Sequence, residues 1–245
     1  MKAPSTNVLV TRPIQQGKQL CSQLINAGFK PISYPTIEIV PIEPNHQLTK
    51  TFKRLADFQF ILFISTNAVI QAQRHQPHWP NNTRYIAIGP KTAQAMANIG
   101  LTVDYMAGKP FNSEQLLSQL PKNLKGKSVL IIKGEGGRDF LTKQLQHMAM
   151  AVEMLDVYKR CVPTDIPIIP AGIKIQFVTI TSQLALENLA KMQAERFKTM
   201  QQDSVFVVLS RRIEIYAKKI GCQFTLVAQS ATDTELVKAI DKATH

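Results

Sequence analysis

The chain has 245 residues, of which 44% are hydrophobic, and a mean hydropathy of −0.07. This composition is typical of one or two globular domains, and no apolar run approaches the roughly 20 residues that a membrane-spanning helix needs. The net charge of +12 favours anionic partners. The basic residues are dispersed and match no nucleic-acid-binding motif, so we expect neither a nucleic-acid nor a membrane partner. The odd number of cysteines (three), without metal-type spacing, predicts free thiols in a reducing cytoplasm.

Short β-branched runs alternate with segments of helix length along the whole chain. The expected strands are, in chain order, 7–12, 30–34, 60–65, 84–89, 101–106, 128–133, 152–155, 175–180, 204–209 and 224–228. Most are continuously apolar, which indicates strands buried on both faces, as in a parallel sheet. The segments "TNAVIQAQRH", "GPKTAQAMANIG", "NSEQLLSQL" and "TDTELVKAI" open with capping or first-turn residues of helices. The repeated β-α order predicts an α/β architecture.

An internal echo suggests that the architecture occurs twice. Three pairs of corresponding positions, at a strand end, a helix end and a helix start, are each separated by 121 residues. The pairs are Gly89 and Ser210, Gly100 and Gly221, and Glu114 and Glu235. A shared separation favours two similar α/β domains over one long sheet, although β-α units resemble one another in general and that simpler explanation stays open.

Two extended stretches bounded by prolines, "SYPTIEIVPIEP" and "EMLDVYKRCVP", suggest where the domains meet. We expect one discontinuous domain, built from residues 1–35 and 172–245, and one inserted domain at 44–153. Residues 36–43 and 154–171 are then linker strands that form a two-stranded β-ladder hinge. Tyr158 on this hinge would face the cleft between the domains, where ligands usually bind.

Strand-to-helix turns rich in Ser, Thr and Gly supply the candidate binding residues, because helix N-termini present free N–H groups to carboxylates. These residues are Ser65, Thr66, Gly89, Thr92, Lys133, Gly134, Ser182 and Ser210. Each turn taken alone is more simply an ordinary helix cap. The glycine cluster "KGEGG" lacks the ending of a P-loop and the spacing of a dinucleotide fingerprint. His75 and His78 are expected to be surface residues rather than a metal pair.

The ordered set "VLVTRP", "FISTNAV", "AIGPKTAQAM", "SEQLL", "IIKGEGGRDFL", "VYKRCVP" and "FVTITS" resembles the uroporphyrinogen-III synthase family over essentially the whole chain. The resemblance implies two flavodoxin-like parallel-sheet domains with the active site in the interdomain cleft. It also implies a cofactor-free hydro-lyase that closes hydroxymethylbilane to uroporphyrinogen III with its last ring inverted. A monomer that receives its substrate from hydroxymethylbilane synthase would fit this activity.

The resemblance also assigns roles to single residues. Tyr158 matches the family's cleft tyrosine, a candidate general acid, and Arg12 of the Arg-Pro motif becomes a candidate ligand of the substrate's eight carboxylates. Lys133 departs from the family, which often has arginine there, so bidentate carboxylate binding would be lost. Two other classes stay open: a non-enzymatic two-domain sensor or binder of an anionic small molecule, and a nucleic-acid binder whose affinity falls steeply with salt.

Overall fold

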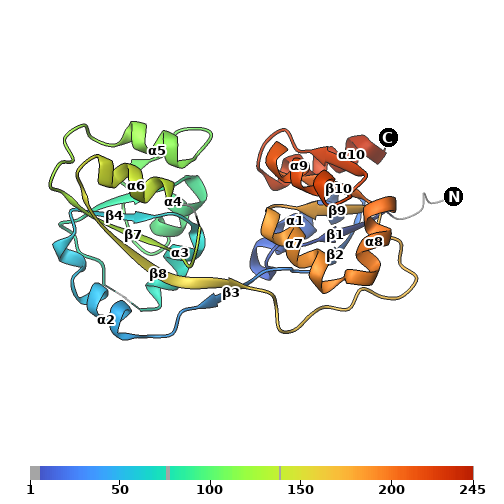
Figure 1. Ribbon diagram of the computed structural model, residues 1–245, viewed down its shortest axis with the longest axis horizontal. Helices are drawn as coiled ribbons and strands as arrows, with labels where there is room; N and C mark the ends of the chain where they lie inside the picture. Colours follow the sequence, from blue (N-terminus) through green and yellow to red (C-terminus); the bar gives the residue numbers. More distant parts are fainter. Residues whose placement is uncertain (1–5, 76–77, 138, 245) are drawn as a thin grey trace. The chain divides into compact units, whose positions relative to one another are not determined.

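The computed structural model describes residues 6–75, 78–137 and 139–244, and the chain divides into two compact units (Figure 1). The discontinuous unit consists of Met1–Glu38 and Cys161–His245, and the inserted unit consists of Ile39–Arg160. The chain therefore passes from one unit to the other twice. Within the described ranges, no helix has both the length and the apolar character that a membrane crossing requires.

The discontinuous unit is a parallel sheet with helices on both faces. Its strand order is β11-β10-β9-β1-β2, and every neighbouring pair is parallel. The strands are β1 (Asn7–Val10), β2 (Lys30–Ser33), β9 (Phe177–Ile180), β10 (Val205–Val208) and β11 (Phe224–Val227). The helices are α1 (Ile14–Asn26), α7 (Gln183–Met192), α8 (Ala194–Asp203), α9 (Arg211–Lys219) and α10 (Asp233–Thr244).

Alternation along the central strands divides the core of this unit into two layers. Val8 and Val10 of β1 pack with α1 and α10 on one face. Leu9, between them, packs with α7, α8 and α9 on the other face. All three side chains are fully buried, which explains why these strands read as continuously apolar in the sequence.

The inserted unit also has helices on both faces of a sheet, whose strand order is β3-β8-β7-β4-β5-β6. The strands are β3 (Glu38–Pro41), β4 (Phe60–Phe63), β5 (Arg84–Ala87), β6 (Tyr105–Met106), β7 (Ser128–Gly134) and β8 (Ala151–Cys161). The helices are α2 (His46–Lys53), the short 3-10 helix η1 (Leu55–Asp57), α3 (Thr66–Gln73), α4 (Pro90–Ala97), α5 (Ser113–Gln119) and α6 (Phe140–His147). Residues of α2, α3 and α4 share one core layer with Ile61 and Phe63, whereas α5 and α6 cover the opposite face.

Paired positions of the internal echo occupy equivalent places in the two units. Gly89 precedes α4 and Ser210 precedes α9 as N-cap residues. Gly100 and Gly221 follow these helices with φ of 81° and 99°. This left-handed conformation favours glycine at a helix end, which is why the same residue recurs there.

Four elements differ from the sequence-based expectations. The strand expected at 101–106 is reduced to Tyr105–Met106, because Asp104 accepts a hydrogen bond from the Tyr85 N–H with its side chain (2.7 Å) and so replaces a ladder contact. The strand expected at 152–155 is longer and spans Ala151–Cys161, where it is the neighbour of β3 in the sheet. Helices α2 and α8 were not expected, because their sequences are polar with few apolar positions.

We expect residues 39–160, produced alone, to fold. This segment keeps every residue of β8 that pairs with β7, as well as Leu155 and Val157 of the core. A shorter segment, 44–153, removes these residues together with Tyr158 and should be far less stable. Fluorescence of Trp79, the only tryptophan of the chain, reports the transition, because its ring packs edge-on against Phe63. Equal stability of the two segments would contradict this prediction.

Candidate active site

Several of the candidate residues of the inserted unit lie just beyond the carboxyl ends of adjacent parallel strands. Ser65 follows β4, Gly89 follows β5, and Gly134 ends β7. Because β5, β4 and β7 are neighbours and run in the same direction, these ends meet at one edge of the sheet. In open α/β sheets this edge is where ligands bind.

Tyr158 reaches the same edge from β8 through an irregularity in the pairing. Lys133 pairs with Asp156, but the next residue, Gly134, pairs with Tyr158, so Val157 is an extra residue on β8. Such a bulge re-aims the side chain that follows it. The Tyr158 carbonyl accepts a hydrogen bond from the Glu135 N–H (2.7 Å), which fixes the strand on the far side of the bulge.

The glycine at position 134 lets the tyrosine ring approach the backbone. A Cβ atom at this position would lie closer than 3.0 Å to three ring atoms of Tyr158, Cζ among them. Real Cβ contacts essentially never reach such distances, so no larger residue fits without displacing the ring. Tyr158 has no exposed surface, and its ring belongs to the core of the inserted unit.

The hydroxyl group of Tyr158 lies between a serine and an arginine. Its oxygen is 3.1 Å from Ser65 Oγ, and the Arg160 guanidinium donates a hydrogen bond to it at 2.8 Å. Arg160 also lies over the ring, with Cζ 5.1 Å from the centroid. Ser65 is the N-cap of α3, because its Oγ accepts the Ala68 N–H at 3.0 Å. A hydroxyl group is therefore held beside a fixed positive charge at the edge of the sheet.

Three other candidate residues of this unit make no hydrogen bond to the Tyr158 hydroxyl group, and they differ in burial. The Lys133 side chain is only 12% exposed, and its ammonium group forms an ion pair with Asp156 at 2.9 Å. Thr92 is 4% exposed in the first turn of α4, whereas Thr66 in the first turn of α3 is partly exposed. Lys133 thus brings less free charge to this edge than its sequence position suggested.

In the discontinuous unit, Ser182 and Ser210 are N-caps of α7 and α9. Ser182 Oγ accepts the Ala185 N–H at 3.1 Å, and Ser210 accepts the Ile213 N–H at 3.5 Å. Both serines are partly exposed. They occupy in this unit the place that Ser65 occupies in the other.

Arg12 follows β1 and is bound to another residue of the same unit. Its guanidinium is 2.8 Å from Asp233 Oδ1, and the side chains are only 11% and 4% exposed. Burial lowers the pKa of Arg12, and the carboxylate of Asp233 partly offsets this effect. Arg12 therefore joins β1 to the start of α10, and any substrate carboxylate would have to share it with Asp233.

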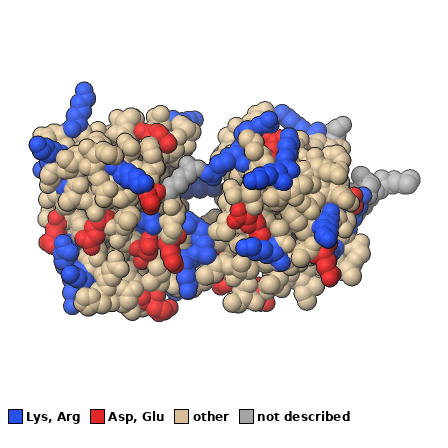
Figure 2. Space-filling view, viewed as in Figure 1, with Lys and Arg blue, Asp and Glu red and all other residues tan. Residues whose placement is uncertain are grey.

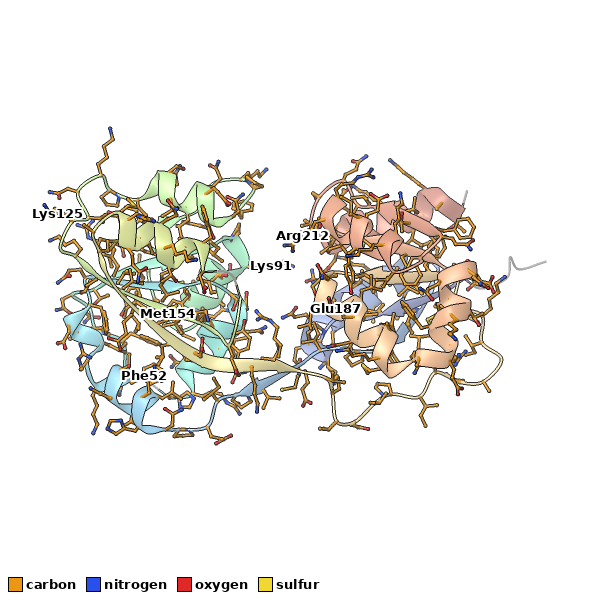
Figure 3. All side chains as sticks on the ribbon, viewed as in Figure 1. Phe52, Lys91, Lys125, Met154, Glu187 and Arg212 are labelled. Atoms are coloured by element: carbon orange, nitrogen blue, oxygen red, sulfur yellow. The ribbon has the colours of Figure 1, made fainter. Side chains whose placement is uncertain are left out.

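Exposed cations lie in the first turns of the two echo-related helices. Lys91 of α4 and Arg212 of α9, both labelled in Figure 3, are exposed. A cation at a helix N-terminus is unfavourable next to the helix dipole, which attracts anions there. Such placement is more useful for binding an anionic ligand than for stability. Figure 2 shows that basic side chains are spread over both units, with acidic ones among them.

Arg160 is a residue of this site that the sequence-based candidates omitted. The available signal was its spacing, because residues i and i+2 of a strand point to the same face, and Tyr158 and Arg160 have this spacing. His75, expected to be a surface residue rather than a metal ligand, is half-buried and stacks its ring on Phe52 with centroids 5.7 Å apart. In the ranges that the structure covers, no three His, Cys, Asp or Glu residues are grouped to hold a metal ion.

Comparison with known proteins gives consistent matches over nearly the full length. Residues 18–238 match the family model described as uroporphyrinogen-III synthase HemD. The chain is 28% identical over 246 residues to uroporphyrinogen-III synthase of Escherichia coli K12, covering 96% of this chain and 99% of that protein. It is 31% identical over 197 residues to the enzyme of Synechococcus elongatus, covering 76% and 74% of the two chains.

Solved structures show the same fold. A mutant uroporphyrinogen III synthase of the extremely thermophilic bacterium Thermus thermophilus superposes with a TM-score of 0.65 at 14% identity, covering 98% of this chain and 99% of that one. Uroporphyrinogen-III synthetase of Helicobacter pylori 26695 gives 0.64 at 12% identity, covering 98% and 100%. At these identities the likeness establishes the fold.

Proposed function

Because the chain belongs to the uroporphyrinogen-III synthase family, we propose that it cyclises hydroxymethylbilane to uroporphyrinogen III. In this reaction, which makes the chain a hydro-lyase of haem or sirohaem biosynthesis, water is lost and the last pyrrole ring is inverted. The match of residues 18–238 to one family carries the proposal. We further propose a cytoplasmic, monomeric enzyme that uses no cofactor and receives its unstable substrate from hydroxymethylbilane synthase.

The chemistry requires positioning more than strong acids or bases. The electron-rich pyrrole helps to expel the hydroxyl group, which gives an azafulvene cation. The substituted carbon of the terminal ring attacks this cation, and the resulting spiro intermediate fragments and closes again with the ring inverted. Closure without an enzyme gives the uninverted ring, so the protein must bring the correct carbon to the cation.

We propose that residues of both units bind the carboxylates of the substrate, through helix N-termini and side-chain hydroxyl groups. These residues are Arg12, Ser65, Thr66, Gly89, Thr92, Lys133, Gly134, Ser182 and Ser210. The exposed cations Lys91 and Arg212 support this assignment. Tyr158 is proposed to assist the departure of the hydroxyl group, since its own hydroxyl is held beside the Arg160 guanidinium.

A coupled assay tests the function directly. Hydroxymethylbilane is made freshly in the cuvette, and the products are oxidised and separated into type I and type III uroporphyrins. We expect type III to predominate in the presence of the protein. Type I alone, at the rate of the spontaneous reaction, would contradict the proposal and favour a non-enzymatic binder.

We expect Tyr158→Phe to lower kcat by about 10²-fold or less. This is the low end of the contribution of a general acid, because the azafulvene forms readily without help. The ring still fills its place against Gly134, so the folded state should be kept, as Trp79 fluorescence would report. The remaining product should be mainly type III, because the shape of the site selects the attacking carbon. A switch to type I would instead assign Tyr158 to positioning of the terminal ring.

A further inference from the structure

Only one assignment of donors and acceptors gives every donor around the Tyr158 hydroxyl group a hydrogen-bond partner. A guanidinium group has donors and no acceptor, so the phenol oxygen accepts from Arg160. The single phenol proton then needs an acceptor, and Ser65 Oγ lies at 3.1 Å. In the opposite direction, the proton of a fully buried hydroxyl would have no partner, which is unfavourable. The hydrogen-bond chain therefore runs from Arg160 through Tyr158 to Ser65.

Ser65 is the end of this chain that has a proton to give, and a ligand can reach it. Its Oγ accepts from both the Tyr158 hydroxyl and the Ala68 N–H, so its own proton points elsewhere. Among the side-chain hydrogen bonds of the described residues, Ser65 Oγ takes part in these two and in no other. Ser65 is partly exposed, whereas Tyr158 has no exposed surface.

We infer that the Ser65 hydroxyl, rather than the Tyr158 phenol, gives its proton to the departing hydroxyl of hydroxymethylbilane, an inference that rests on the proposed function. As the substrate C–O bond breaks, the electron pair stays on oxygen, which takes the Ser65 proton and leaves as water. Ser65 takes the proton of Tyr158, and the resulting phenolate is stabilised by the adjacent guanidinium of Arg160. After the last C–C bond has formed, the pyrrole carbon loses a proton, which returns through Ser65 to the phenolate.

Ser65 is thus the catalytic residue of this step, and Tyr158 and Arg160 are positioning residues that act through it. A double-mutant cycle measures this dependence. The values of kcat/KM with fresh hydroxymethylbilane are compared for the native chain, Ser65→Ala, Tyr158→Phe and the double variant. We expect each single variant to lose about 100-fold or less, at or below the low end of the contribution of a general acid, and the double variant to lose no more than the worse single one.

Ser65 also caps α3, and this role must be separated from proton transfer. Ser65→Asn keeps an acceptor for the Ala68 N–H but has no acidic hydroxyl, so it should be as slow as Ser65→Ala. Ser65→Thr keeps both functions and should restore most of the activity. Asn45→Ala is the matched control, because it removes a similar cap from α2, where Asn45 accepts the Leu48 N–H at 2.9 Å.

Arg160 supplies an independent readout. If it stabilises the phenolate, Arg160→Gln lowers kcat and leaves KM nearly unchanged, and Arg160→Lys recovers part of the loss. If it only attracts substrate carboxylates, KM rises instead, and this outcome would remove Arg160 from the chain of proton transfers.

The outcomes separate the inference from the proposed function. A native chain that makes type III product, together with losses that multiply in the double variant or with near-native activity of Ser65→Ala, overturns the Ser65 assignment alone. A native chain that makes no type III product overturns both.

Discussion

Replacement of Gly134 by alanine should damage the site more than the loss of the Tyr158 hydroxyl does. The new Cβ would overlap three ring atoms of Tyr158, and the backbone has little room to retreat, because β7 is paired with β4 as far as Ile132 and with β8 as far as Gly134. The ring must therefore move and take its hydroxyl away from Ser65 and Arg160. We expect activity at or below that of Tyr158→Phe, with a destabilisation of about 1–3 kcal/mol, typical of an overpacked core.

Urea unfolding followed by Trp79 fluorescence, together with kcat/KM, measures both effects. Gly108→Ala is the control, since a Cβ there meets only Gln115 Oε1 at an ordinary 3.6 Å. In a Tyr158→Ala background, where the ring is absent, Gly134→Ala should cost little further stability. An equal cost in both backgrounds would show that the ring contact is not the cause.

The β-α order, the parallel sheets and the helix starts could be predicted from the sequence because they depend on local signals. Apolar runs mark strands that are buried on both faces. Ser65 and Ser182 combine a capping side chain with a position directly after such a run, and both are N-caps in the structure. The resemblance added the family, which the comparisons establish.

The environment of Tyr158 could not be predicted, because residues far apart in the sequence create it. The bulge at Val157 depends on how β8 pairs with β7, and nothing in "LDVYKRC" alone indicates an extra residue. The close contact joins Gly134 and Tyr158, and the hydroxyl contact joins Tyr158 to Ser65, which lies 93 positions earlier. Register and long-range packing therefore decide what the tyrosine touches.

The ion pair of Arg12 could not be predicted from the sequence either. The Arg-Pro motif suggested a carboxylate ligand at the end of β1, but the sequence does not reveal that Asp233 lies 2.8 Å from this guanidinium. A buried arginine attracts a carboxylate of the protein as readily as one of a substrate. The charge that a sheet edge offers to a substrate is therefore known only after the ion pairs within the protein are known.

Loss of the Asp233 carboxylate should be among the most destabilising single changes in the discontinuous unit. Arg12 is 11% exposed, so in Asp233→Ala its charge would remain largely buried without a partner. Removing one member of a buried ion pair typically costs about 3–5 kcal/mol. The first turn of α10 also loses an anion that its dipole favours, an effect of about 0.3–1 kcal/mol.

Denaturant unfolding followed by circular dichroism measures this loss. Glu195→Ala is the matched control, because Glu195 is an exposed carboxylate in the first turn of α8, in the same unit. A second substitution, Arg12→Met, removes the unpaired charge and should restore at least half of the stability lost in Asp233→Ala. A loss as small as that of Glu195→Ala would show that water or a neighbouring group compensates Arg12.

The double variant also decides what Arg12 does for the substrate. If Arg12 only joins β1 to α10, the variant with both substitutions should regain stability and keep the native KM for hydroxymethylbilane. If Arg12 shares its guanidinium between Asp233 and a substrate carboxylate, stability should return while KM rises. The second result is the one we expect, because a guanidinium has five N–H donors in a planar fork and can bind two carboxylates at once.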